Sequence, residues 1–259
     1  MPPSTIVNSE DGIQWYIEQQ GSGPHLILIP SGEGDCESFA KIAAFLARDF
    51  TVTTFDMPGM SRTTCPPSAV ADVTAPLLAK QIVGLMDELK IQVATFYGCS
   101  SAGLAALSLV ANHPERVQSA IVHEVPLHFL PDLEKLSKKD DAEIIIACRQ
   151  IFATTFNKDP AAWEALGCEF HARLERNYVT WLRSYTRLVP EELSNEDLTR
   201  RPITWTIGAL TAAGAFFDNV VTATKAGIEI GTLQSKHFPQ VSIPDVLAAH
   251  IKSSALKYI

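Results

Sequence analysis

The segment GCSSAG at residues 98–103 places two adjacent serines among small residues. A nucleophilic serine on a parallel sheet is held in a strained turn between a strand and a helix, and this turn needs small residues two positions before and after the nucleophile. Ser100 has Gly98 and an alanine there, whereas Ser101 has Cys99 and a glycine. We favour Ser100 because Gly98 can adopt backbone angles that Cys99 adopts only with strain. A tight turn without a catalytic role is the plain alternative.

Two backbone amides near these serines are candidates for an oxyanion hole. Residues 31–34, SGEG, directly follow an apolar run, at the point where folds of this kind place the backbone amide of one donor. The second candidate is the amide of Ser101, at the start of the helix that follows Ser100. Two such donors stabilise the tetrahedral intermediate of acyl transfer. For residues 31–34, a glycine-rich turn without a catalytic role is the alternative.

His237 is the candidate for the general base. The usual order on such a sheet is serine, acid, histidine, so the base is expected after the last strand. His237 lies in the loop 235–239, between the predicted final strand at 228–232 and a terminal helix. The other histidines fall in predicted strands, in a surface turn, in the segment 126–190 or on the last helix; they are His25, His113, His123, His128, His171 and His250.

The acid that would orient this histidine is placed less conventionally. It commonly follows the strand predicted at 203–207, but the next residues include no carboxylate before Asp218, which lies inside a predicted helix. Glu124 ends the preceding strand and keeps the required order. We therefore expect Glu124 to accept the N–H of His237 and to stabilise the imidazolium, with Asp218 as the reserve. A capping or gating role for Glu124 is a further alternative.

Short apolar runs precede these candidates, as is typical of strands buried on both faces of a parallel sheet. Segments with helical periodicity separate the runs. This alternation predicts an α/β fold with a doubly wound, mostly parallel sheet, in which functional residues gather beyond the carboxyl ends of the strands. The predicted strands are 13–18, 25–30, 51–55, 93–97, 120–123, 203–207 and 228–232, and the predicted helices are 39–47, 75–89, 102–112 and 216–225.

The segment 126–190 interrupts this alternation. It contains no convincing buried strand, only helix-like stretches at 141–152 and 161–176. We interpret it as a helical cap inserted into a core formed by residues 1–125 and 191–259. A separate helical domain would need its own core and linkers, which a segment of this size bounded directly by strands does not favour.

Composition restricts the possible partners. Hydrophobic residues make up 46% of the 259 residues and charged residues 19%, so the chain can build a large core. The formal net charge of −8 argues against nucleic acid, whose binding needs clustered Lys and Arg. No segment is long and apolar enough to span a membrane, and the start of the chain does not resemble a signal peptide. We therefore expect a cytoplasmic protein without a membrane partner.

The five cysteines predict neither a disulfide framework nor a metal site. They are odd in number, far apart and without a C-x-x-C pair, which favours reduced thiols. We expect no metal and no organic cofactor. The sequence does not decide between a monomer and a homodimer.

Several longer motifs resemble those of the fungal zearalenone lactonases, which are α/β-hydrolases that open the ester of a resorcylic macrolactone mycotoxin. The resemblance covers essentially the whole chain, and its long runs are family signatures rather than generic fold residues. The motifs are GIQWY at 12–16, VTTFDMPGMSR at 52–62, GCSS at 98–101, His123-Glu124, FFDNVVTATKAG at 216–227 and HFP at 237–239.

This resemblance implies a Ser-His-Glu triad of Ser100, His237 and Glu124 and oxyanion donors at Gly32 and Ser101. The family pattern has an aspartate at the position of Ser31 and a glycine at that of Ala102. We call residues 31–34 the oxyanion loop, and we expect the substrate contacts beside it to differ from those of the family. The substrate-binding residues that it implies are Ser31, Leu130, Ile151, Trp181, Tyr185, Phe216 and Phe238.

The expected function is hydrolysis of the ester bond in an apolar macrocyclic lactone, zearalenone or a related resorcylic lactone. Two other functions remain open from the sequence. One is a general carboxylesterase acting on acyclic esters, and the other is a non-catalytic receptor for a small ligand on the same fold.

Overall fold

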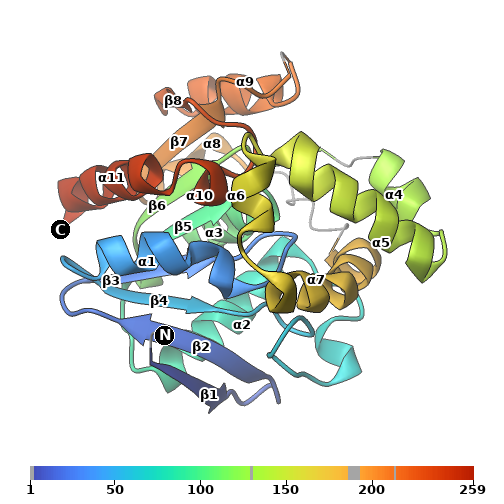
Figure 1. Ribbon diagram of the computed structural model, residues 1–259. Coiled ribbons are helices and arrows are strands. Elements are labelled where there is room, and N and C mark those ends of the chain that lie inside the picture. Colours follow the sequence, from blue (N-terminus) through green and yellow to red (C-terminus); the bar gives the residue numbers. More distant parts are fainter. Residues whose placement is uncertain (1–2, 129–130, 186–192, 213) are drawn as a thin grey trace.

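In the computed structural model, which describes residues 3–128, 131–185, 193–212 and 214–259, eight strands form one sheet in the order β1-β2-β4-β3-β5-β6-β7-β8. The pairs β1–β2 and β2–β4 are antiparallel, and every other neighbouring pair is parallel. The predicted α/β class with a mostly parallel sheet is therefore confirmed (Figure 1). The strands are β1 (Ser4–Asn8), β2 (Gln14–Gln20), β3 (His25–Ile29), β4 (Thr51–Phe55), β5 (Ala94–Cys99), β6 (Val117–His123), β7 (Ile203–Gly208) and β8 (Ile230–Leu233).

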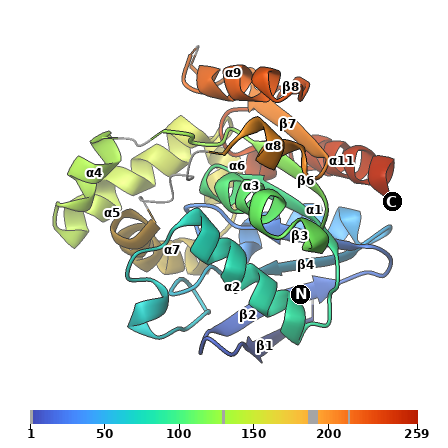
Figure 2. The same cartoon turned by 180° about the vertical axis from the view of Figure 1, so that it is seen from behind.

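Helices cover both faces of this sheet. Helices α1 and α11 lie on the face that Figure 1 presents, and α2 and α3 lie on the face that Figure 2 presents. The strands between them are mainly apolar because both of their faces are buried, as in β3, where the adjacent residues Leu28 and Ile29 point to opposite faces and are wholly inaccessible. The helices of this core are α1 (Ala40–Leu46), α2 (Ala75–Glu88), α3 (Ser101–Asn112), α8 (Asn195–Thr199), α9 (Phe217–Lys225), α10 (Pro239–Ser242) and α11 (Pro244–Ala255).

Four further helices follow β6 and precede β7 in the chain, and Figure 1 shows them grouped at one side of the sheet. They are α4 (Pro131–Ser137), α5 (Asp141–Gln150), α6 (Pro160–Glu164) and α7 (Cys168–Thr180). Helices α5 and α7 each continue into a wider π-helical turn, Ile151–Phe156 and Trp181–Tyr185. We call residues 126–190 the cap; its separation from the core as a unit stays a prediction. No helix within the described ranges is long and apolar enough to cross a bilayer.

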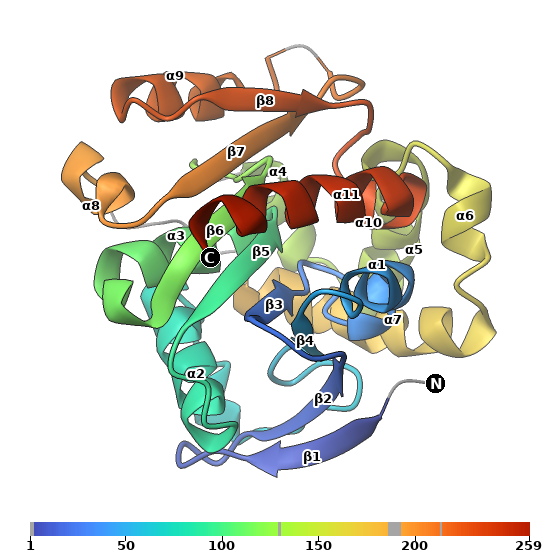
Figure 3. The same ribbon diagram turned by 90° about the vertical axis from the view of Figure 1, so that its left-hand side faces the viewer.

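Two expectations from the sequence were wrong in detail. The helix expected at 161–176 is divided between α6 and α7, because Gly167 has a φ of 96°, a conformation that ends one helix before the next begins. The edge strand β1 was missed. Four of its five residues are exposed, so it lacks the apolar pattern of the inner strands, and Figure 3 shows it at one margin of the sheet beside β2.

Candidate active site

Ser100 occupies the turn between β5 and α3 in a strained conformation. Its φ of 56° and ψ of −131° lie outside the regions that serine normally adopts, and its amide donates to the carbonyl of His123 at 2.9 Å. Gly98 is required for a reason other than the one we expected. Its φ is not positive, but a Cβ at this position would lie 2.4 Å from the carbonyl oxygen of Ala102. The strain therefore falls on Ser100 itself, as in a nucleophile elbow.

Ser101 lies in a different environment from Ser100. It is the first residue of α3, its side chain is buried, and its hydroxyl is 3.3 Å from the hydroxyl of Ser31. Ser31 belongs to the loop after β3, so this contact joins that loop to the start of α3, the two segments that would supply the oxyanion donors. Ser100 therefore holds the strained turn position, and the Ser101 hydroxyl is hydrogen-bonded to that of Ser31.

Glu124 and His237 are in direct contact. The Nδ1 atom of His237 lies 2.7 Å from Oε2 of Glu124, while Oε1 accepts a 2.7 Å hydrogen bond from the amide of Gly208. Glu124 has a φ of 44°, an unusual value for a side chain of this size. Gly208 is the last residue of β7, the strand after which the acid is commonly found. A Cβ there would lie 2.8 Å from Oε1 of Glu124, so the glycine makes room for the carboxylate from β6.

The charge state of Glu124 follows from its neighbours. Burial alone would raise the pKa of this carboxyl, but the hydrogen bond from His237 and the charge of that ring outweigh burial and the pKa is lowered. An ionised carboxylate only accepts hydrogen bonds, so Nδ1 of His237 must be the donor. The Nε2 atom is then free to act as a base. Asp218, the reserve candidate, instead accepts a 2.8 Å hydrogen bond from the amide of Asn219.

His237 and Ser100 are not hydrogen-bonded to each other in the described part of the chain. Such bonds are commonly long in enzymes without substrate. A second contact nevertheless ties their segments together, because the Cys99 thiol donates to the backbone carbonyl of His237 at 2.9 Å. Burial raises the pKa of Cys99 well above its ordinary value, so the thiol keeps the proton that it donates.

Aromatic rings surround the imidazole of His237. Phe216 stacks on it at 5.2 Å between ring centroids, Phe238 at 5.3 Å, and Phe156 approaches to 4.7 Å. A cavity of about 860 Å³ opens here, and His237, Phe156 and Phe216 form part of its wall. Phe156 was missed at the level of the sequence. The only signal for it was its spacing of four residues from Phe152 on one helical face, which is equally typical of core residues.

The other predicted substrate-binding residues differ in their surroundings. Trp181 lies against the oxyanion loop, since a Cβ on Gly32 would be 2.7 Å from its ring. Tyr185 is buried, and its hydroxyl donates to the carbonyl of Pro58 at 2.7 Å. Ile151 is half-buried at the start of its π-helical turn, and Leu130 lies outside the described residues. Only Phe216 among these predicted residues borders the 860 Å³ cavity, as far as the described residues show.

Glu33 is a fully buried acid in the oxyanion loop. Its Oε1 atom accepts hydrogen bonds from Ser38 at 3.0 Å and from Gln240 at 3.4 Å, but Oε2 has no partner among the described residues. Burial raises the pKa of Glu33 from its ordinary value of 4.5 to about 7. Near neutral pH the Glu33 carboxyl is therefore partly protonated in the folded protein.

The raised pKa predicts that the protein loses stability as the pH rises from about 4.5 to about 7, because only the folded state keeps the proton on Glu33 over that interval. Glu33→Gln is expected to remove this part of the pH dependence and to be the more stable protein above pH 7. Urea unfolding of both proteins at pH values on each side of the interval measures the effect. If the free energy of unfolding changed with pH in the same way in both proteins, this prediction would be wrong.

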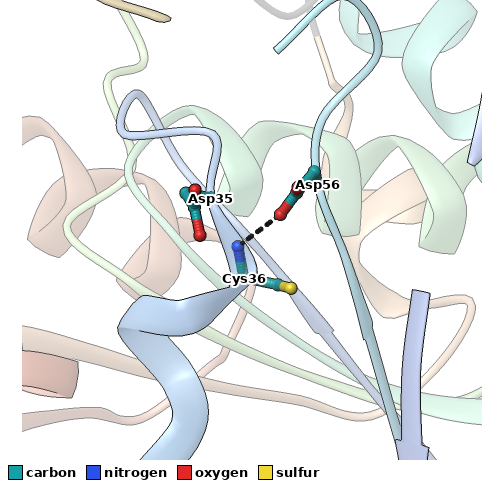
Figure 4. Close-up of side chains that lie close together, drawn as sticks. All are labelled: Asp35, Cys36 and Asp56. Atoms are coloured by element: carbon teal, nitrogen blue, oxygen red, sulfur yellow. Dashed lines mark hydrogen bonds between the residues drawn. The ribbon is translucent and has the colours of Figure 1, made fainter. Parts of the chain in front are cut away.

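Asp35, Cys36 and Asp56 lie close together beside the oxyanion loop (Figure 4). The Cys36 amide donates a hydrogen bond to Asp56 at 2.9 Å. Both carboxylates form ion pairs with arginines. Arg62 reaches Asp56 at 2.7 Å and Asp35 at 3.1 Å, and Arg173 reaches the second oxygen of Asp35 at 2.6 Å. Burial raises the pKa of the Cys36 thiol well above its ordinary value. The two carboxylates therefore belong to an ion-pair network with the arginines, and the Cys36 thiol beside them keeps its proton.

Comparison with known proteins agrees with this architecture. Residues 24–161 match the family described as alpha/beta hydrolase fold. The chain is 40% identical to a zearalenone hydrolase of Bionectria ochroleuca, with 100% of both chains covered. It is 44% identical to a zearalenone hydrolase of Cladophialophora bantiana, covering 99% of this chain and 97% of that one.

Among solved structures, the enol-lactonase from Burkholderia xenovorans LB400 resembles the chain with a TM-score of 0.77 at 20% identity, covering 98% of this chain and 100% of that chain. At this identity the likeness concerns the fold alone. The family match and the two full-length relatives go further, and they show that this chain belongs to the zearalenone hydrolase family of α/β-hydrolases.

Proposed function

We propose that the protein is a serine hydrolase that opens the ester bond of an apolar macrocyclic lactone, zearalenone or a related resorcylic lactone. The observation that carries the chemistry is the 2.7 Å contact between Glu124 and Nδ1 of His237, close to a serine held at a φ of 56°. The two full-length relatives named zearalenone hydrolase support the substrate class. The aromatic wall beside His237 suits a ligand built on an aromatic ring.

In the first step Nε2 of His237 takes the proton of Ser100, and the serine oxygen bonds to the lactone carbonyl carbon. The carbonyl π electrons move to oxygen, and the amides of Gly32 and Ser101 stabilise that charge. Glu124 holds the imidazole in the tautomer that leaves Nε2 free and stabilises the imidazolium once it forms.

In the second step the tetrahedral intermediate collapses and the ring C–O bond breaks. His237 gives its proton to the leaving alkoxide, which stays attached to the acyl group because the substrate is a ring. The product is a hydroxy-acyl ester of Ser100. A water activated by His237 then attacks this ester, releases the open hydroxy acid and returns the proton to Ser100. Each step uses only groups of this chain and water.

Incubation of the purified protein with zearalenone and, separately, with an open-chain aryl ester tests the proposal. We expect the macrolactone to gain the mass of one water, with a higher kcat/KM than the acyclic ester, because the aromatic wall binds the ring system. Preferred turnover of the acyclic ester would identify a general carboxylesterase. Saturable binding of zearalenone with no turnover of either compound would identify a receptor.

A further inference from the structure

One face of the cap helix α7 lies along the oxyanion loop. Arg173 and Asn177 of α7 are followed at the same interval of four residues by Trp181, which begins the π-helical turn that continues the helix, so all three project from one side. All three contact residues 32–37. Arg173 binds the carboxylates of Asp35 and Glu37, and the ring of Trp181 lies where a Cβ on residue 32 would fall. Asn177, between these two residues, donates a hydrogen bond to the backbone of the oxyanion loop at 2.7 Å.

Asn177 is wholly buried and uses every polar atom of its side chain. Its Oδ1 accepts from the amide of Ser61 at 2.8 Å, and its Nδ2 donates to the hydroxyl of Ser61 and to the backbone carbonyl of Glu33, each at 2.7 Å. Ser61 is held in turn by Asp35 at 2.7 Å. The amide therefore joins the cap to two loops of the core at once.

The contact with Glu33 holds the backbone of the oxyanion loop between two other hydrogen-bonded carbonyls. The carbonyl of Ser31 accepts from the Gly34 amide at 3.0 Å, and the carbonyl of Gly34 accepts from the Met57 amide at 2.9 Å. These are contacts within the backbone. The carbonyl of Glu33, between them, is held by a side chain from another element.

This arrangement leaves the Gly32 amide available. It is buried, and it donates to no group among the described residues. A buried free N–H is costly, so a loop that presents one must be held in place by its other hydrogen bonds. If the carbonyl of Glu33 were released, the peptide planes of residues 32–34 could rotate and the amide could turn toward another acceptor.

We propose that Asn177 is a positioning residue of the oxyanion hole, holding the carbonyl of Glu33 so that the Gly32 amide faces the reacting carbonyl. This role rests on the proposed function. The oxyanion hole then depends on residues of both the core and the cap, and α7 must stay in contact with the oxyanion loop during the reaction. Substrate must then reach Ser100 past parts of the cap other than α7.

Asn177→Asp and Asn177→Ala test the role. The aspartate keeps the shape but places an acceptor against the Glu33 carbonyl, and the alanine removes the contact. Loss of a whole oxyanion donor lowers kcat by roughly 10²–10³-fold, so we expect misalignment of one donor to lower kcat by about 10–100-fold with little change in KM. Controls are Arg176→Ala, on the exposed side of the same helix, and Ser61→Gly, which removes a hydroxyl but leaves the Glu33 contact.

A trifluoromethyl ketone separates positioning from general stability. Ser100 adds to its carbonyl carbon, the oxygen becomes an oxyanion in the hole, and His237 keeps the proton. We expect the affinity for this compound to fall by the same factor as kcat in both Asn177 variants, while the affinity for the ring-opened product stays at the wild-type value. The two controls should retain wild-type affinity for both compounds.

Equal affinity of wild type and Asn177 variants for the ketone would overturn the proposal, as would failure of both variants to fold at a temperature where Ser61→Gly is folded. Those results leave the proposed function intact. Wild-type protein that neither binds the ketone nor opens the lactone would contradict the proposed function instead, so the two failures are distinguishable.

Discussion

Ser100→Ala is expected to lower the rate of lactone opening by a factor on the order of 10⁵, since removal of the nucleophile of a serine triad leaves only binding and the oxyanion hole. The variant should fold, because alanine lacks only the side-chain oxygen of serine and the position is half-buried. Loss of activity with an unchanged circular dichroism spectrum and an unchanged KM for any residual reaction is the expected result.

Ser101→Ala is the matched control for that experiment. The group that Ser101 would supply to the reaction is its backbone amide, which alanine retains. The variant loses only the hydroxyl contact to Ser31, at 3.3 Å. We expect it to keep activity within about tenfold of the wild type, since one neutral hydrogen bond contributes about 1 kcal/mol. A fluorophosphonate should label the peptide that contains Ser100 in this variant as in wild type. The reverse pattern, an inactive Ser101→Ala and an active Ser100→Ala, would move the nucleophile by one residue.

Most of the inner strands were predictable because they are largely buried on both faces and have mainly apolar sequences, whereas β2 was indicated by its alternation of apolar and polar residues. The predicted strand at 51–55 coincides with β4, and the runs at 25–30 and 203–207 differ from β3 and β7 by one residue at the end. The exposed strand β1 has no such signal. Helix α7 was misplaced at its start because a pattern of apolar residues does not register the positive φ of Gly167.

The pairing of Glu124 with His237 was predictable for a similar reason, since strand ends of a parallel sheet converge and chain order limits the candidates. The reason why a glycine is needed at position 98 was not predictable. A sequence shows that glycine is present, but only the structure shows whether its dihedral angles or its missing Cβ are needed. At this position the carbonyl of Ala102 fills the space of a side chain.

Contacts between cap and core could not be inferred from the sequence at all. Asn177 meets Glu33 across 144 positions of the chain and Ser61 across 116, and neither residue belongs to a motif that predicts a partner. Arg173 and Asp35 are a further example. Such pairs are set by how α7 lies on the core, and that placement depends on many weak contacts rather than on any local pattern.

Glu124→Gln has the second largest expected effect. Glutamine keeps the shape of the side chain but has no negative charge, so it neither stabilises the imidazolium of His237 nor holds the Nδ1–H tautomer securely. In a serine triad the comparable change of acid to amide lowers kcat by about 10⁴-fold, and we expect a decrease on the order of 10³–10⁴ here. Measurement of kcat and KM for lactone opening should show the loss in kcat, because no substrate contact is removed.

Asp218→Asn is the control that decides between the two acids considered from the sequence. Asp218 accepts from the Asn219 amide and lies 3.7 Å from His128, and it has no hydrogen bond to His237 among the described residues. We expect its variant to retain activity close to wild type at neutral pH. If Asp218→Asn were instead the more damaged enzyme, the acid would have to change position during the reaction, and the 2.7 Å contact of Glu124 would be a structural one. The contrast between these two carboxylates tests the triad more sharply than either variant alone, because both carry the same charge and only one touches the imidazole.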